Sequence, residues 1–286
     1  MLKEPRVLDN LKSWIGKTET VVDEVTTSSV RRIRAMLDYE PATVRAGDVL
    51  PTGWHATVCA PLARQSELGE DGHPKRGSFI PPVPFARRMA GSAQMTFHAD
   101  LLVGDTVTRK SLIENVVAKK GRSGDIVFVT QKNDFYTVRG LAVTERHELA
   151  FREVTRGRET SPPGEKVDTR PAWQMTIVVD PVMVFRYAAV AFSGHRIHYD
   201  YQYGTKTENY ADVMGSGGLN VMLLFDLVQR NLPCRIVNFA SRNIRPIFVN
   251  ERVHVCGTYG SDKTHLKLWI TNDEGVLAVV ANAELA

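Results

Sequence analysis

The 286-residue chain has few cysteines and no long hydrophobic run. Its three cysteines, Cys59, Cys234 and Cys256, lie far apart and form no Cys-x-x-Cys pair. This spacing argues against a zinc site and a disulfide framework, so we expect no bound metal and a reducing compartment. No apolar stretch approaches the roughly 18 residues of a membrane-spanning helix, and the charged, proline-containing residues 1–6 are unlike a signal peptide. We therefore expect a cytoplasmic protein without a membrane partner.

The chain also lacks a strong excess of charge. Its formal net charge is +4, and the basic residues are scattered apart from short clusters at 31–34 and 119–122. A nucleic-acid-binding protein would show a denser basic stripe with interleaved aromatic residues, so we expect no nucleic-acid partner. Hydrophobic residues make up 43% of the chain and charged residues 24%, which is typical of a globular protein with a full core.

Two parts of the sequence resemble each other. Residues 132–150 and 271–286 each place an Asn-Asp pair and a following glycine between β-rich runs, which is typical of a β-hairpin. Upstream of them, residues 101–107 parallel residues 247–253. These similarities predict an internal duplication.

A polar stretch with proline and glycine, residues 155–166, interrupts the chain near its middle and indicates a linker. We expect an N-terminal half over residues 1–155, a linker over 156–169 and a C-terminal half over 170–286.

Each half opens with a segment that favours a helix. Thr27, Ser28 and Ser29 can cap residues 30–37, which place apolar side chains on one face. In the second half, Gly217 and Gly218 precede residues 219–228, which are apolar nearly all round and so favour a buried helix. One central helix followed by antiparallel strands, twice over, predicts an α+β fold.

The densest polar cluster follows an apolar run that ends at residue 192. Residues 193–200 contain His195, Arg196, His198 and Asp200. Such a cluster at the end of a buried segment destabilises the fold unless its members are paired or used. Histidine is the side chain best suited to move protons near neutral pH. We therefore expect the catalytic residues here.

Several motifs together give the chain a family resemblance. It resembles the MaoC-like hydratases and dehydratases, in particular the FAS1-like dehydratase branch, which includes mitochondrial 3-hydroxyacyl-thioester dehydratases, mesaconyl-C4-CoA hydratases and itaconyl-CoA hydratases. The resemblance spans most of the chain and is carried by residues 79–84, 97–98 with 104–105, 121–124, 185–187, 194–200 and 242–246. It implies a double hotdog, in which an antiparallel sheet wraps around a helix in each half.

The wider family carries the motif Gly-Asp-x-Asn-Pro-x-His, whose Asp and His act as a dyad. On this sequence the Asp position falls on His195 and the His position on Asp200, so the pair is present with its members exchanged. His198 falls on the Pro position and is the rival imidazole. An imidazole and a carboxylate across a tight turn can flank one water molecule, and which group takes the proton stays open.

Adding water to an enoyl thioester also requires donors for the thioester oxygen. The backbone N–H groups of Gly217 or Gly218, at the start of the buried helix, can supply them. The alternative is that both glycines serve only close packing of the helix.

Five basic residues are candidates for binding the substrate. Arg186 and Arg196 bracket the site and can receive a free carboxylate of the acyl group; alternatively, either pairs with an internal acid such as Asp200. The other three can hold the phosphates of coenzyme A or simply be solvated, and they are Arg242, Arg245 and Lys263.

The resemblance implies a hydro-lyase that acts reversibly on an enoyl-CoA thioester and needs no cofactor beyond the coenzyme A of its substrate. We expect itaconyl-CoA as the substrate, giving citramalyl-CoA, because of the arginines near the site and because the first 25 residues do not resemble a transit peptide. Mesaconyl-C4-CoA hydration is the nearest alternative, followed by dehydration of a 3-hydroxyacyl thioester. A thioesterase and a non-catalytic acyl-CoA-binding protein are further alternatives.

The first half has no equivalent of the histidine cluster, so we expect it to shape the substrate pocket. Its polar loop, residues 69–77, is either a lid over that pocket or a plain surface loop. We also expect a homo-oligomer.

Overall fold

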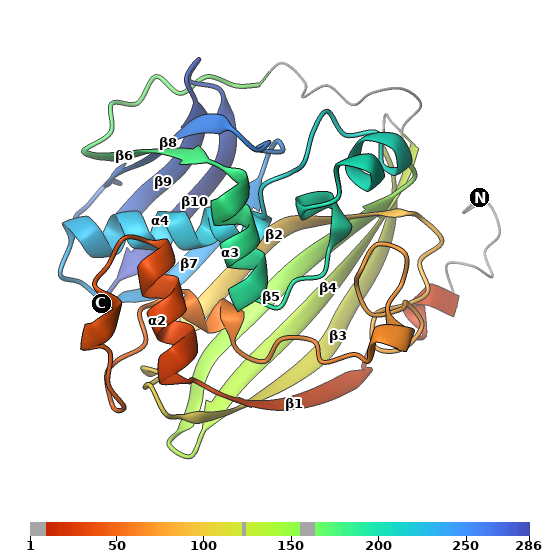
Figure 1. Ribbon diagram of the computed structural model, residues 1–286, viewed down its shortest axis with the longest axis horizontal. Helices are drawn as coiled ribbons and strands as arrows, with labels where there is room; N and C mark the ends of the chain where they lie inside the picture. Colours follow the sequence, from red (N-terminus) through yellow and green to blue (C-terminus); the bar gives the residue numbers. More distant parts are fainter. Residues whose placement is uncertain (1–9, 122–123, 155–163) are drawn as a thin grey trace.

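A computed structural model describes residues 10–121, 124–154 and 164–286. Within these ranges, ten strands form one antiparallel sheet in the order β1-β3-β4-β5-β2-β7-β10-β9-β8-β6 (Figure 1). The first half contributes β1 (Thr18–Glu24), β2 (Arg87–Phe97), β3 (Thr106–Gly121), β4 (Gly124–Thr137) and β5 (Gly140–Arg152). The second half contributes β6 (Trp173–Val179), β7 (Ile236–Asn243), β8 (Glu251–Tyr259), β9 (His265–Asn272) and β10 (Leu277–Leu285).

The strand order shows the duplication directly. It reads the same from both ends when β1 to β5 are matched with β6 to β10, and the two halves meet where β2 pairs with β7. Equivalent turns precede β3 and β8. Gly104 and Asn250 both have positive φ, and their N–H groups donate to the carbonyls of Val25 and Val179. The expected α+β class with an internal duplication is confirmed. Most of the expected linker, residues 155–163 of 156–169, lies outside the described residues.

The predicted hairpin turns are correct in one half only. In the second half, Asn272 and Gly275 flank the turn between β9 and β10. In the first half, Asn133 lies within β4, and the turn falls at residues 138–139, before Gly140. Asn133 does not turn the chain because its side chain is buried and accepts a hydrogen bond from Ser111 on β3.

Three α-helices accompany the sheet within the described ranges: α2 (Thr27–Met36), α3 (Pro181–Val190) and α4 (Gly217–Asn231). The Thr26 side chain caps α2 by accepting the N–H of Ser29. The apolar α4 is buried, as expected, and crosses the face of the second half of the sheet (Figure 1). None of the described helices is both long and apolar enough to cross a membrane.

The expectation of a central helix in each half is wrong for the first half. The helix α2 follows β1 as α3 follows β6, so it is the counterpart of α3 and not of α4. Residues 37–86, all of them described, contain three short 3-10 turns and no longer helix. The first half of the sheet therefore has no counterpart of α4 on its face, and a cavity of about 360 Å³ lies there.

Candidate active site

The cavity lies between the first half of the sheet and the loops that replace the missing helix. Strands β3, β4 and β5 form its floor through Arg109, Gln131, Asn133, Phe135, Glu145, His147 and Leu149. Loop residues between 56 and 80 cover it, and Arg88 of β2 lines it. The second half contributes Tyr187, Ala191 and Gly218, from α3, its end and the start of α4. The expectation that the first half shapes the pocket agrees with this lining.

Three imidazoles gather at one end of this cavity. His195 and His198 lie on the turn that follows α3, at the start and end of a 3-10 turn, Arg196–His198. The ring of His195 lies 4.5 Å from that of His73 and 5.2 Å from that of His198, measured between centroids. His73 lines the cavity, and His195 is buried beside it.

The loop of residues 69–77, which carries His73, packs directly on the histidine turn. A Cβ atom at Gly72 would lie 1.9 Å from the carbonyl oxygen of Gly194, and Gly72 has a φ of +84°. The N–H of Arg196 donates to the carbonyl of Asp71 at 3.0 Å. The loop therefore belongs to the site, and because residues 73–75 line the cavity, the structure favours a loop that covers the pocket over a plain surface loop. Sequence reasoning missed His73, although it follows a glycine as His195 does.

The imidazoles are held in their neutral form. Burial lowers the pKa of His195 and of His73 well below the usual value, and nearby positive charge, including that of Arg88, acts in the same direction. Burial also lowers the pKa of His198. The Nδ1 of His198 lies 2.9 Å from the carbonyl oxygen of Met214. Because a carbonyl only accepts, Nδ1 carries the proton and Nε2 is free to accept one.

The carboxylate that faces His195 belongs to Glu208. Its Oε1 lies 4.0 Å from Nε2 of His195, and its side chain is 1% exposed. Burial raises the pKa of Glu208 to about 7, against the opposing effects of Tyr203 and Arg87. This carboxyl group can therefore both give and take a proton near neutral pH. No pattern in the sequence marks Glu208, which reaches the site only through the fold.

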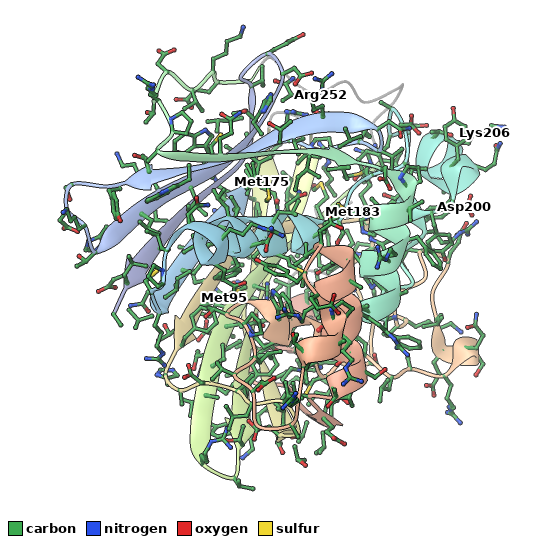
Figure 2. All side chains as sticks on the ribbon, turned by 60° about the vertical axis from the view of Figure 1, so that its left-hand side comes forward. Met95, Met175, Met183, Asp200, Lys206 and Arg252 are labelled. Atoms are coloured by element: carbon green, nitrogen blue, oxygen red, sulfur yellow. The ribbon has the colours of Figure 1, made fainter. Side chains whose placement is uncertain are left out.

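The expected pairing of His195 with Asp200 is not formed. Oδ2 of Asp200 accepts from Arg196 Nη2 at 2.7 Å and Nε at 3.0 Å, and Oδ1 accepts from the N–H of Tyr203. Figure 2 shows Asp200 near the outer edge of the molecule, close to Lys206. The physical reason for the correction is that a guanidinium four residues away captures the carboxylate locally.

The two glycines expected to bind the thioester oxygen differ in position. Gly218 lines the cavity, and a Cβ atom there would lie 2.1 Å from the hydroxyl oxygen of Tyr187. A Cβ atom at Gly217 would lie 3.3 Å from Nδ2 of Asn243. A side chain at position 218 would clash with Tyr187 more severely than one at 217 would with Asn243, so close packing requires glycine more strongly at 218. Gly218 also borders the cavity.

The two arginines expected to bind the acyl carboxylate do not line the cavity. Arg186 is exposed on α3. Arg196 pairs with Asp200, and its guanidinium lies 4.2 Å from the ring centroid of Tyr203. For Arg196 the structure thus favours the alternative of pairing with an internal acid.

The residues expected to hold coenzyme A phosphates also lie outside the cavity lining. Arg245 is 8% exposed, pairs with Glu251 at 2.5 Å and donates to the carbonyl of Pro246. Its charge is therefore used inside the second half. Arg242 on β7 and Lys263, between β8 and β9, are exposed.

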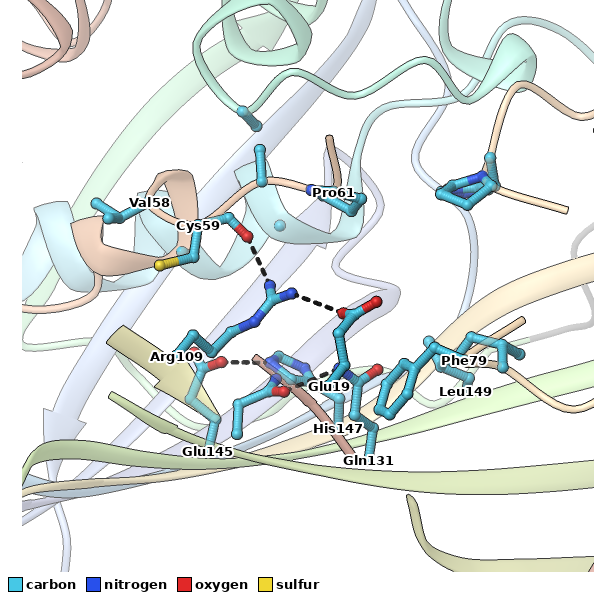
Figure 3. Close-up of a pocket in the computed structure, with 18 of the residues that line it drawn as sticks. Glu19, Val58, Cys59, Pro61, Phe79, Arg109, Gln131, Glu145, His147 and Leu149 are labelled. Carbon is cyan, nitrogen blue, oxygen red and sulfur yellow. Dashed lines mark hydrogen bonds and ion pairs between the residues drawn. The ribbon is translucent and has the colours of Figure 1, made fainter. Parts of the chain in front are cut away.

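A second titratable cluster, unexpected from the sequence, forms the cavity floor. Glu145 lies between two imidazoles, with Oε1 2.6 Å from His55 Nε2 and Oε2 2.9 Å from His147 Nε2. Burial alone would raise the pKa of Glu145, but the two histidines hold this pKa well below its usual range. Beside them, Arg109 donates to the carbonyl of Cys59 and to Glu19 (Figure 3). The charges of this cluster are mutually compensated.

No group of three or more histidine, cysteine or acidic residues in the described part of the chain is arranged to hold a metal ion.

Comparisons with known proteins show the family and the fold of the chain. The family model of hydroxyacyl-thioester dehydratase type 2 matches residues 53–249. Mesaconyl-C(4)-CoA hydratase of Chloroflexus aurantiacus is 34% identical over 96% of this chain and 97% of its own. The mitochondrial hydroxyacyl-thioester dehydratase type 2 of Schizosaccharomyces pombe is 26% identical over 72% of this chain and 77% of its own. The double hotdog structure of Rv0216 from Mycobacterium tuberculosis superposes with a TM-score of 0.59 at 11% identity. The match covers 95% of this chain and 94% of that chain. The double hotdog fold is thus confirmed.

Proposed function

Because the chain belongs to the hydroxyacyl-thioester dehydratase type 2 family, whose named relatives are hydro-lyases, we propose that it adds water reversibly to an enoyl-CoA thioester in this cavity. The observation that carries the proposal is that neutral imidazoles meet Glu208 directly beside His73, which lines the cavity as Tyr187 and Gly218 do.

The acid–base pair of this proposal is His195 with Glu208. The separation of 4.0 Å is longer than a direct hydrogen bond, so the pair is not locked together before substrate binds. In hydration, a neutral imidazole takes a proton from water as the oxygen bonds to the β-carbon. The protonated carboxyl of Glu208 gives its proton to the α-carbon, and the imidazolium then passes the proton taken from water to the Glu208 carboxylate, which restores both groups. His73, which lines the cavity, packs on His195. General acid–base assistance of this kind contributes about 10²–10⁴-fold.

The thioester oxygen gains negative charge as the β-carbon is attacked. The N–H of Gly218, at the N-terminus of α4, is placed to stabilise that charge, because the helix dipole and an unpaired amide both favour an anion there. A donor of this type contributes about 10²–10³-fold to the rate.

The substrate we propose first is mesaconyl-C4-CoA. It is supported by the 34% identity to a mesaconyl-C(4)-CoA hydratase over almost the whole of both chains. Itaconyl-CoA is the second candidate, because it too is a branched enoyl thioester with a free carboxylate. The arginines that first favoured itaconyl-CoA, Arg186 and Arg196, do not line the cavity, which removes that argument. The homo-oligomer and the cytoplasmic location stay predictions.

The test is an assay of the purified protein with mesaconyl-C4-CoA, itaconyl-CoA and crotonyl-CoA. For mesaconyl-C4-CoA and crotonyl-CoA we expect the absorbance of the conjugated enoyl thioester to fall without release of free thiol, and for itaconyl-CoA, whose double bond is not conjugated with the thioester, we expect mass spectrometry to detect the hydrated thioester. Release of thiol would instead identify a thioesterase. Binding of the thioesters with no change in absorbance would identify an acyl-CoA-binding protein, and either outcome would overturn the proposal.

A further inference from the structure

Arg88 is an arginine of the cavity wall whose guanidinium is unpaired. Its neighbour Arg87, on the other face of β2, donates to the carbonyl of Glu208 and stacks on Tyr210. Arg76, close by, donates to backbone carbonyls, including that of Val83. By contrast, none of the described residues makes a hydrogen bond or a short ion pair with Arg88, although it borders the cavity.

The charges around Arg88 do not neutralise it. The acid that acts on it is Asp71, whose Oδ1 accepts the N–H of His73 and whose Oδ2 faces Arg76 at 3.7 Å. Arg76 repels Arg88, and the imidazoles beside it are neutral. Burial lowers the pKa of Arg88 to about 10, so it stays protonated at neutral pH. An uncompensated cation in such a place is destabilising until an anion arrives.

The other cations of the cavity are already engaged. The two terminal nitrogens of Arg109 donate to the carbonyl of Cys59 and to Glu19. His147 is paired with Glu145. Lys75 is exposed and donates to the carbonyl of Ser66. Arg88 is therefore the cavity cation with a free fork of donors, a geometry that fits a carboxylate through two parallel hydrogen bonds.

We infer that Arg88 binds a free carboxylate on the acyl group and so selects dicarboxylic enoyl thioesters, an inference that rests on the proposed function. Arg88 lies close enough to His73 and His195 for its charge to act on both. A carboxylate held by Arg88 is thus a near neighbour of the acid–base groups. Mesaconyl and itaconyl groups carry such a carboxylate on the double bond itself, next to the carbon that reacts.

The kinetic test compares Arg88→Gln and Arg88→Lys with the parent protein on mesaconyl-C4-CoA, itaconyl-CoA and crotonyl-CoA. We expect Arg88→Gln to lower kcat/KM for a dicarboxylic substrate by about 10²-fold, because removing one partner of a buried charge pair leaves the other uncompensated. For crotonyl-CoA the loss should stay within about fivefold, and Arg88→Lys should recover only part of the selectivity. If Arg88→Gln lowered kcat/KM equally for all three substrates, Arg88 would instead interact with the thioester oxygen, which they share, and the inference would be overturned.

The matched control is Arg252→Gln. Arg252, labelled in Figure 2, lies on β8, is not among the residues that line the cavity, and forms a surface ion pair with Asp273. Its replacement should leave all three rates unchanged, because such pairs contribute little.

A binding measurement separates this inference from the proposed function. Free mesaconate and itaconate should raise the Tm of the parent protein, crotonate should do so much less, and Arg88→Gln should abolish the difference. A protein that hydrates crotonyl-CoA but shows no such preference keeps the proposed function and loses the inference. A protein that binds the dicarboxylates through Arg88 but hydrates no thioester keeps the inference about the site and loses the proposed function.

Discussion

At the scale of single residues, Glu208 and Asp200 differ in how their charges are compensated. Asp200 accepts hydrogen bonds from Arg196 and from the N–H of Tyr203, which holds its pKa below the usual value. Glu208 is buried, and its pKa is raised to about 7. A carboxyl group that exchanges protons near neutral pH suits catalysis, whereas a firmly ionised one suits structure.

Replacing these two acids by their amides should therefore have unequal effects. We expect Glu208→Gln to lower kcat by about 10²-fold or more, because an amide cannot exchange a proton. Asp200→Asn should keep kcat within about tenfold, because its amide oxygen can still accept from Arg196 or Tyr203. The measurement is steady-state hydration with both variants checked for native circular dichroism. A larger loss in Asp200→Asn than in Glu208→Gln would restore Asp200 as the acid of the dyad.

The stability of the protein should depend on pH through Glu208. Because its pKa is about 7 in the folded chain and 4.5 when unperturbed, the folded state binds more protons than the unfolded state between these values. Stability should thus fall as pH rises through this window, by at most about 3 kcal/mol. Glu208→Gln removes this dependence. The Tm of Glu208→Gln and of the parent protein should be measured at pH 5, 6, 7 and 8. We expect the Tm of the variant minus that of the parent to increase as pH rises. A constant difference would show that the carboxyl group titrates normally.

The part of the site that is predictable from the sequence consists of residues that are close together along the chain. His195 and His198 stand in one short turn, so the motif placed them together. Glu208 directly follows the π-helical turn Tyr203–Thr207, His73 lies in a loop and Arg88 lies in β2, so only the fold brings them together. Asp200 was predicted as a catalytic acid because spacing alone does not reveal that Arg196 pairs with it.

At the scale of elements, the loop of residues 69–77 and the histidine turn form one unit. Gly72 approaches Gly194 too closely to allow a Cβ atom, and Arg196 donates to the carbonyls of Asp71 and Glu70 through its N–H and its side chain. The relative position of His73 and His195 therefore depends on this loop. A small displacement of the loop should lower the reaction rate, because the two imidazoles would no longer be aligned.

Gly72→Ala tests this unit, with Gly47→Ala as the matched control. Both glycines have positive φ, +84° and +89°, so alanine strains both by about 1 kcal/mol. At Gly47 a Cβ atom would meet nothing within 4 Å, whereas at Gly72 it would lie 1.9 Å from the carbonyl oxygen of Gly194. We expect Gly72→Ala to lower Tm further than Gly47→Ala and to reduce kcat at least tenfold. Equal Tm losses with unchanged rates would mean that the loop contact does not position the imidazoles.

The helices show what patterning predicts about elements. The burial of α4 is correctly predicted from its apolar run, and α2 is correctly predicted to exist, but it begins at Thr27 and is capped by Thr26, three residues before the expected start. The sequence does not reveal that α2 corresponds to α3 and not to α4. Periodicity shows which face of a helix is apolar, but not where the helix packs. The long segment between α2 and β2 has no helix of comparable length, which no local pattern announces.

At the scale of the whole molecule, the duplication is symmetric in the sheet and asymmetric in what covers it. The second half buries α4 against its strands, and the first half keeps a cavity in the corresponding place. The acid–base groups His195, His198 and Glu208 come from the second half, and the floor of the cavity comes from the first. Neither half alone supplies all of these groups, because His73 of the first half also packs on His195.

The two halves should nevertheless unfold together. One hydrophobic cluster contains Trp54 and Phe97 of the first half with Phe225 and Phe239 of the second, and β2 pairs with β7 across the middle. Unfolding one half would expose this shared core and the edge of β7, so a half-folded state is strongly disfavoured. We expect hydrogen exchange followed by mass spectrometry in increasing urea to show protection of β4 and β9 lost at the same midpoint. Loss of protection in β4 at a clearly lower urea concentration than in β9 would contradict the shared core, and would show that the half without a central helix is held only by its own contacts.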